Sequence, residues 1–501
     1  FNTQRKRSRQ KFEWQRSSII GCFLVTFVLS GVSIWFFKSS LVLSYETSDP
    51  ARHFLWALNF ARTSDFQPGV MNFHMVNVGL LLKMVAPLID PFNLYKVFIV
   101  SDIGFFLLSA LLFYQTLCRL TEKLKNHWLI FIGTIVFAIG YPLNAMIFGF
   151  GYFPTGLILI QTTLLVWILF LLVLGLFNSY ILFVPIAVVG ILITSLLAWQ
   201  KSSQFTSFQF WQVALGAVVL PIFISLFYYK FLPESPAAVN EISNDGYIYF
   251  DLFRDFILFV PLIVYFLWKV ILIPKEKNLV LTIFFGCTLL QMAIMFILGI
   301  SGIVSPYYYA KHNAVLWIWI VLMAFSVISY LLNRGKWKGL GLLTGLMILM
   351  VVSLPVISRT AGWIPEDFNP QPSSTGILPV YRFNLAKISA VDESLLDQKR
   401  TLFLEAKNLA NQTDSIQIPL ISFDSADGIW FHAMSELNPT AISANQGQFA
   451  DPQEVYDRWE ASKSDYLLFV DNRENFQLML NKLVHDHHLV YQNDAGYIVK
   501  K

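Results

Sequence analysis

Residues 17–37, SSIIGCFLVTFVLSGVSIWFF, form an apolar run, and the polar stretch 45–53, YETSDPARH, follows shortly after it. A helix needs about 20 apolar residues to cross the hydrocarbon core of a bilayer, so the run predicts a spanning helix. Six Lys and Arg residues precede the run, and basic flanks tend to stay on the cytoplasmic side. The sequence therefore predicts a cytoplasmic N-terminus and places the polar stretch outside.

The whole chain has the composition of a membrane protein. Apolar residues make up 55% of its 501 residues, charged residues only 14%, and the mean hydropathy is +0.56. Soluble domains carry about 25% charged residues, so a soluble protein of this size is excluded. Runs of spanning length cover residues 17–37, 95–118, 128–148, 155–177, 180–199, 208–229, 256–273, 279–300, 314–332 and 339–357.

The expected number of spans depends on the basic loops. The shorter apolar run 75–89 contains Asn77 and Lys83 and is interpreted as an interfacial helix. Lys and Arg residues near positions 125, 277 and 336 predict cytoplasmic loops. Four runs then lie between position 125, expected inside, and position 231, expected outside. A chain that passes from the inside to the outside must cross the membrane an odd number of times, so four spans do not fit. Either one run is re-entrant or split, or 75–89 spans after all, so we expect nine to eleven spans.

The composition changes at residue 359. Four prolines between 365 and 379, with Ser373, Ser374 and Gly376, predict a linker over 359–380. Strand and helix patterns then alternate over 381–501, which indicates a layered α/β domain closed by a hairpin at 489–500.

The expected fold is a polytopic α-helical membrane protein with a C-terminal extracytoplasmic α/β domain. Its parts are a basic N-terminus with the first span (1–37), a first external loop with interfacial helices (38–94), a multi-span domain (95–358) with a second external loop (231–255), the linker (359–380) and the soluble domain (381–501).

Asp49 has two compatible interpretations. It precedes Pro50 and the aromatic run 51–61, and an acidic residue before Pro favours a helix start. A carboxylate beside the membrane can also take a proton from an acceptor hydroxyl, which is general-base catalysis. Candidate substrate contacts that accompany it are Glu46, Arg52, His53, His74 and, from the second external loop, Asp251.

Residues 305–312, SPYYYAKH, form a second polar cluster. Tyr and Lys both collect at membrane interfaces, so an interfacial belt is one interpretation. The other is a phosphate site made of Tyr307, Lys311 and His312, in which the lysine neutralises the phosphate and the histidine donates a hydrogen bond.

This layout resembles the GT-C superfamily of integral membrane glycosyltransferases. Asp49 matches the catalytic Asp that these proteins carry in the first external loop, and residues 66–91 are similar to the loop and interfacial helix before their second span. Residues 231–255 occupy the place of the second external loop, and residues 307–312 that of the late phosphate-binding segment. Many members have paired acidic residues in the first loop, where this chain offers Glu46 and Asp49.

The resemblance implies a single inverting displacement. A polyprenyl-phosphate sugar lies with its tail between spans and its phosphate near Lys311, while Asp49 deprotonates the acceptor hydroxyl. The expected activity is hexosyl or pentosyl transfer to a glycan, lipid or cell-envelope polymer at the outer face of a bacterial cell membrane. Membrane lipids are expected partners and nucleic acid is not. No cofactor is expected, although Glu46, Asp49 and Asp251 would supply ligands for a divalent metal if they converged.

Three rival functions stay open. One is a non-catalytic scaffold whose soluble domain recognises a partner, although this would leave the charged first loop unexplained. A lipid-linked glycan polymerase or ligase also uses external Arg and His residues, but its key loop usually lies late in the chain, whereas the richest polar cluster here comes early. A non-enzymatic lipid or glycan transporter predicts charged residues or broken helices at mid-membrane. The apolar runs look nearly free of charge, which favours the transferase.

Overall fold

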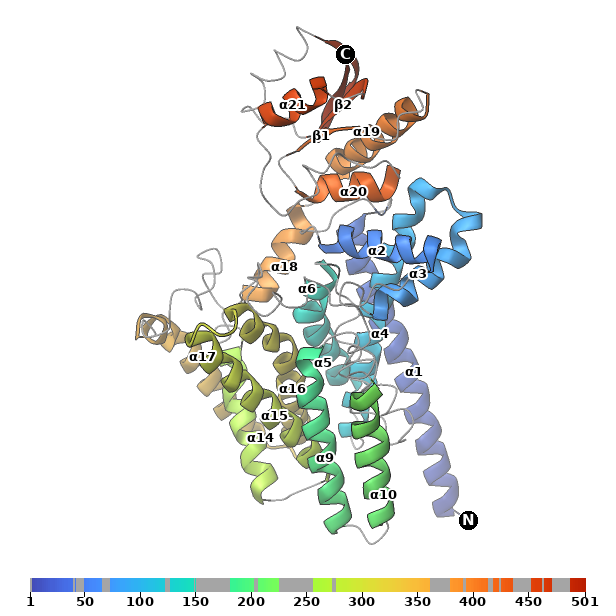
Figure 1. Ribbon diagram of the computed structural model, residues 1–501. Coiled ribbons are helices and arrows are strands. Elements are labelled where there is room, and N and C mark those ends of the chain that lie inside the picture. Colours follow the sequence, from blue (N-terminus) through green and yellow to red (C-terminus); the bar gives the residue numbers. More distant parts are fainter. Residues whose placement is uncertain are drawn as a thin grey trace.

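The computed structural model describes residues 2–38, 41, 49–64, 73–121, 127–147, 149, 181–201, 206–224, 256–272, 276–360, 379–390, 393–412, 418–422, 425–435, 452–461, 464–470 and 487–501. These residues form a mostly helical molecule with a small sheet near the C-terminus (Figure 1). The sheet and helices α2 and α3 lie at one end, and the N-terminus lies at the other.

The helices of the first part of the chain are α1 (Asn2–Phe37), α2 (Asp49–Thr63), α3 (Phe73–Val85), η1 (Ala86–Leu88), η2 (Pro91–Asn93), α4 (Leu94–Leu120), α5 (His127–Ile139) and α6 (Tyr141–Ile147). The middle part contains η3 (Ile181–Phe183), α9 (Val184–Lys201), α10 (Ser207–Trp211), the π-helix η4 (Gln212–Val219), η6 (Ile257–Phe259), α14 (Val260–Leu272), α15 (Glu276–Ile300), α16 (Pro306–Asn333) and α17 (Trp337–Thr360).

Six helical stretches of the described chain are long and apolar enough to cross a membrane. They are Ile19–Phe37, Pro91–Leu120, His127–Ile147, Ser207–Ile224, Asn278–Ile300 and Lys311–Asn333, and shorter apolar helices cover Met75–Leu88, Val184–Gln200, Ile257–Leu272 and Trp337–Met350. Each predicted run except 155–177, which lies outside the described residues, therefore coincides with an apolar helix. The total of nine to eleven spans stays a prediction.

Helix α16 is the central helix of the bundle. Every residue from 315 to 324 is buried, as expected for a helix that is apolar on all sides. A Cβ on Gly140 would lie 2.7 Å from Trp317, and one on Gly133 would lie 2.8 Å from Phe325. Positions that increase along α5 thus meet positions that decrease along α16, so the two helices are antiparallel.

The outer surface of the bundle is apolar. Phe23 and Phe27 of α1 are 73% and 79% exposed, and Ile271 of α14 is 79% exposed. Large apolar side chains on the outside of a soluble protein would be unusual at this density, but they suit a surface covered by lipid.

The C-terminal part contains α18 (Pro379–Ala390), α19 (Glu393–Gln412), β1 (Leu420–Ile421), α20 (Ser425–Ser435), α21 (Pro452–Ala461), β2 (Tyr466–Val470), β3 (His488–Asn493) and β4 (Gly496–Lys500). The sheet order is β1-β2-β4-β3, with β1 parallel to β2 and the other pairs antiparallel. All five residues of β2 are buried, as expected for a strand covered on both faces. The predicted α/β character and closing hairpin are confirmed.

Helix α18 connects the two parts of the molecule. It begins at Pro379 and packs against α6 and α1 rather than standing apart from the bundle. The residue boundaries of the sequence-based domains stay predictions.

Candidate active site

The candidate site lies at the start of α2. The helix begins at Asp49 with Pro50 in its first turn, so the predicted helix start is confirmed. The Asp49 side chain is half-buried. A carboxylate at this position also interacts favourably with the positive end of the helix dipole.

His53 lies one turn after Asp49 and is buried, with 6% of its surface exposed. Burial lowers the pKa of His53 from 6.5 to about 4, although nearby Asp49 and a hydrogen bond with the Gly149 backbone act in the opposite direction. Removing the charged imidazole from water costs more free energy than these two interactions contribute to stabilising it. His53 is therefore neutral at pH 7, and the site holds an uncharged ring beside the carboxylate.

Gly149 lies two residues after the end of α6 and packs against Pro50 at the start of α2. Its φ is +74°, and a Cβ at this position would lie 2.5 Å from Cγ of Pro50. Only glycine adopts this conformation readily and also leaves space for the proline ring. Gly149, two residues after the end of α6, thus lies directly against the helix that carries Asp49.

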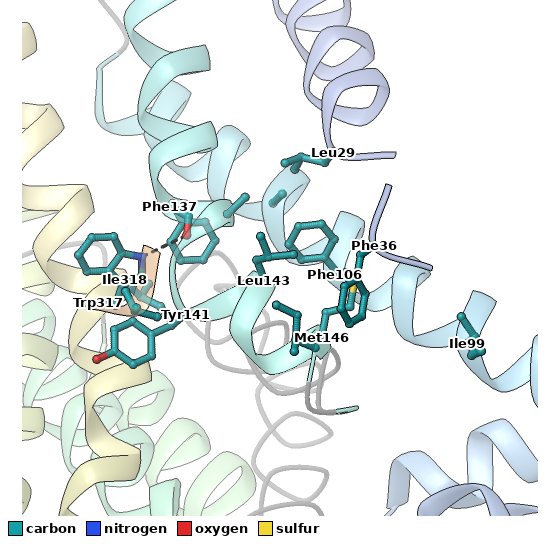
Figure 2. Close-up of a cluster of buried hydrophobic side chains, with 14 of the residues drawn as sticks. Leu29, Phe36, Ile99, Phe106, Phe137, Tyr141, Leu143, Met146, Trp317 and Ile318 are labelled. Carbon is teal, nitrogen blue, oxygen red and sulfur yellow. Dashed lines mark hydrogen bonds between the residues drawn. The ribbon is translucent and has the colours of Figure 1, made fainter. Parts of the chain in front are cut away.

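The span that contains α5 and α6 lies within the predicted run 128–148 and is interrupted at Gly140. An interruption leaves backbone carbonyls without helical partners, and in a membrane they must be satisfied within the protein. Trp317 Nε1 donates to Phe137 O at 3.1 Å, as Figure 2 shows. The hydroxyl of Tyr381 donates to Val136 O.

Asn384 of α18 completes this arrangement. Its Nδ2 donates to Ile139 O and to Gly140 O, both at 2.8 Å, and its Oδ1 accepts from Nδ2 of Asn144 at 3.1 Å. The side chain is 1% exposed. An asparagine from the C-terminal part therefore holds α5 and α6 at the angle that leads to Gly149.

Lys311 and His312 lie in the second turn of α16. Lys311 is half-buried, with Nζ 5.2 Å from the centre of the Tyr308 ring. His312 is fully buried, and its ring meets Phe183 edge-on at 5.3 Å. Its Nδ1 donates to Tyr308 O at 2.7 Å. A neutral ring then keeps Nε2 as an acceptor, so the expected hydrogen bond from His312 to a phosphate requires a protonated ring.

The starts of α2 and α16 lie at a similar level of the bundle. Tyr141 packs against Trp317 with ring centres 6.0 Å apart. Lys311 precedes Trp317 by six residues, and Ile147 follows Tyr141 by six residues. Since the helices run in opposite directions, both rise about 9 Å toward the same end at 1.5 Å per residue. Lys311 therefore lies at the same height along the bundle as Ile147. Ile147 precedes Gly149, the glycine that contacts Pro50, by two residues.

Of the remaining predicted site residues, Arg52 lies beside this point, and the others are not placed by the described part of the structure. Glu46 and Asp251 lie outside the described residues. His74 lies in α3 and Tyr307 in α16, but their side chains are outside the described part of the structure. Arg52 is half-buried on α2. Within the described ranges, no group of three His, Cys, Asp or Glu residues is arranged to hold a metal ion.

Asp102 is a buried acid that was not among the predicted site residues. It lies within α4 and is 5% exposed, so the expectation of nearly charge-free spans was wrong at this position. Phe98, one turn earlier, lies 5.8 Å from Phe54 of α2. Phe106, one turn later, belongs to the cluster with Met146 of α6 (Figure 2). The carboxylate therefore occupies the helix turn between the contacts with α2 and α6. An acid inside an apolar run was the signal that could have identified it.

The C-terminal part covers α2. Trp430 of α20 stacks on Phe54 at 5.8 Å and meets Tyr95 at 6.4 Å, while Lys407 of α19 lies 6.0 Å from the Phe92 ring. Figure 1 shows α20 directly above α2. The small α/β part thus packs against Phe54, the residue next to His53 in the sequence.

Searches of protein-family models and of curated protein sequences found no match to this chain. Among solved structures, the crystal structure of the Archaeoglobus fulgidus oligosaccharyltransferase in complex with Zn and sulfate is similar to it. The TM-score is 0.45 and the sequence identity 12%, over 89% of this chain and 68% of that chain.

Proposed function

We propose that this protein is an inverting glycosyltransferase. It moves a hexosyl or pentosyl group from a polyprenyl-phosphate donor to a hydroxyl of a glycan, lipid or cell-envelope polymer. The observation that carries the proposal is the common level of two helix starts, one with Asp49 and one with Lys311, linked by the interrupted span and Gly149.

Each residue has a defined role in the proposed reaction. Asp49 takes the proton of the acceptor hydroxyl, whose oxygen attacks the anomeric carbon from the face opposite the phosphate. The bond between the anomeric carbon and the phosphate oxygen breaks, and polyprenyl phosphate leaves with the electron pair. Lys311 stabilises the negative charge that develops on that phosphate. Tyr307 and His312 line the phosphate, while Glu46, Arg52, His53, His74 and Asp251 contact the substrates.

The environment of Asp49 suits a base. No hydrogen bond or ion pair engages its carboxylate in the part of the chain that the structure describes. His53 is neutral at pH 7 because its pKa is about 4, so it adds no positive charge that would weaken the base. The reaction as written balances without a metal or another cofactor.

The test is sugar transfer from polyprenyl-phosphate hexoses and pentoses by the purified protein, comparing wild type with Asp49→Asn. Asparagine starts a helix as well as aspartate does but cannot accept the proton. We expect transfer to fall by a factor of about 10² to 10⁴ with the thermal unfolding midpoint unchanged. Asp90→Asn is the matched control, because Asp90 also lies at the start of a helix, where it accepts from Phe92 N at 2.7 Å.

Unchanged transfer in Asp49→Asn would reject the role of Asp49 as the base. Equal losses in Asp49→Asn and Asp90→Asn would mean that both act through folding. Transfer from none of the polyprenyl-phosphate sugars would reject the donor class.

A transporter is the second candidate, because the structure contains two features that it predicts: the buried Asp102 and the interruption at Gly140. In transporters, however, such broken ends bind the substrate, whereas four of the carbonyls at this break accept from Tyr381, Trp317 and Asn384. Movement of a lipid-linked glycan across vesicles that Asp102→Asn abolishes and Asp49→Asn leaves intact would favour the transporter.

A further inference from the structure

Three cations surround the ring of Tyr330 near the end of α16. Nζ of Lys269 lies 5.6 Å from the ring centre, Cζ of Arg334 lies 6.0 Å away, and Nζ of Lys336 lies 5.9 Å away. We call these four residues the Tyr330 cluster. Lys269 comes from the last turn of α14, so the cluster joins the ends of two helices.

The sequence determines how Arg334 and Lys336 reach the same ring. Gly335 has a φ of +62°, and it follows the last turn of α16. Gly335 N donates to Leu332 O at 3.1 Å, and Lys336 N donates to Leu331 O at 2.9 Å. This pair of bonds is the Schellman motif, which ends a helix and reverses the chain at a left-handed glycine.

The cluster has an excess of positive charge. Three cations within about 6 Å of one ring centre lie within about 12 Å of one another, and like charges at that separation repel. None of the three forms an ion pair with a carboxylate in the ranges that the structure describes. The electrons of the ring attract each cation but do not neutralise it. A bound anion would relieve the repulsion.

The surroundings of the cluster favour an anion that is attached to acyl chains. Trp268 and Trp337 are 52% and 68% exposed, and Ile271 and Leu272 of α14 are 79% and 56% exposed. Exposed tryptophans at the ends of apolar helices are typical of the membrane interface. Basic pockets between helix ends at that interface fit lipid head groups.

We propose that the Tyr330 cluster is a binding site for the phosphate head group of an anionic phospholipid. The phosphate lies between Lys269, Arg334 and Lys336, and the acyl chains lie along the exposed apolar residues of α14. This site is separate from Asp49 and does not depend on the proposed glycosyl transfer.

The test measures lipid binding to the purified protein in detergent by native mass spectrometry, with phosphatidylglycerol and phosphatidylcholine as probes. We expect wild type to prefer phosphatidylglycerol, and each of Arg334→Gln and Lys336→Gln to weaken that binding about fivefold. Raising the ionic strength should reduce the preference, because salt screens exposed charges. Lys500→Gln is the matched control, since Nζ of Lys500 lies 5.7 Å from the Tyr466 ring, far along the chain in the sheet.

The exposed positions of Arg334 and Lys336 make the variants safe for folding, and a thermal unfolding curve checks this. Equal affinity for the two lipids would overturn the proposal, as would the same loss in Lys500→Gln. Glycerol phosphate as a third probe separates the sources of phosphate. If it displaces phosphatidylglycerol at equal concentration, the site takes soluble phosphate and the lipid assignment is wrong.

Discussion

Polar side chains are held in two different ways in this molecule. Near the starts of α2 and α16 and at the break between α5 and α6, His53, His312 and Asn384 are buried and bond to backbone groups. At the turn after α16, Arg334 and Lys336 are exposed, and both of their charged groups lie over the Tyr330 ring. The first arrangement depends on fixed positions of neighbouring atoms, whereas the second depends on charge. Small changes in shape should therefore be costly in the first region and nearly neutral in the second.

The largest expected effect is that of Asn384→Ala, which removes the donor to Ile139 O and the acceptor of Asn144 Nδ2, whereas Gly140 O keeps its hydrogen bond from Asn144 N. Each buried polar group left without a partner costs about 1–3 kcal/mol, so we expect a loss of about 4 kcal/mol in the free energy of unfolding. Unfolding in detergent, followed by circular dichroism, measures it. Ser389→Ala on the same helix is the control, because its hydroxyl is exposed. Equal stability of the two variants would show that Asn384 does not hold the break.

Gly149→Ala comes next, with an expected loss of about 3 kcal/mol from a left-handed backbone and an overlap with Pro50. Gly302→Ala is the matched control, because it separates backbone strain from overlap. The φ of Gly302 is also positive, at +70°, but nothing lies within 4 Å of its added Cβ. The control should lose only the backbone part, about 1 kcal/mol. Similar losses would mean that contact with Pro50 is unimportant. Sugar transfer should fall only in Gly149→Ala, because that change moves the start of α2.

The pH dependence of His53 is a third comparison. Its pKa is about 4 in the folded protein and 6.5 in the unfolded chain. The unfolded state binds more protons between these values, so stability rises with pH there and is lost as pH falls from 6.5 toward 4. The loss is at most about 3 kcal/mol, at 1.36 kcal/mol per pKa unit. The difference between wild type and His53→Gln in unfolding at pH 7.5 and pH 4.5 measures it. Identical pH profiles would contradict the burial of a neutral ring.

The smallest effect is expected at the other region. Lys336→Gln should change the free energy of unfolding by less than about 0.5 kcal/mol, because exposed charges contribute little to stability. The unfolding midpoint without added lipid tests this. A large loss would mean that the Tyr330 cluster is a structural element held by geometry, and it would remove the contrast between the two regions.

Much of the fold follows from local sequence, because the information is contained in neighbouring residues. Apolar runs of spanning length became apolar helices, since a membrane helix satisfies its own backbone bonds. Asp49 with Pro50 predicted the start of α2 correctly, and the alternating pattern near the C-terminus predicted the hairpin β3–β4. The glycine at 335 likewise determines its own turn.

Tertiary structure decided what these local elements bring together. Nothing near Gly140 in the sequence indicates that Asn384, far along the chain, bonds to the break. Nothing near His53 indicates that Gly149 contacts it, or that Trp430 stacks on Phe54. Asp102 was visible as an acid in an apolar run, but only packing places it between α2 and α6. Sequence patterns determine elements through local backbone and solvent preferences, whereas a site depends on the relative positions of distant elements, which only packing of the whole chain fixes.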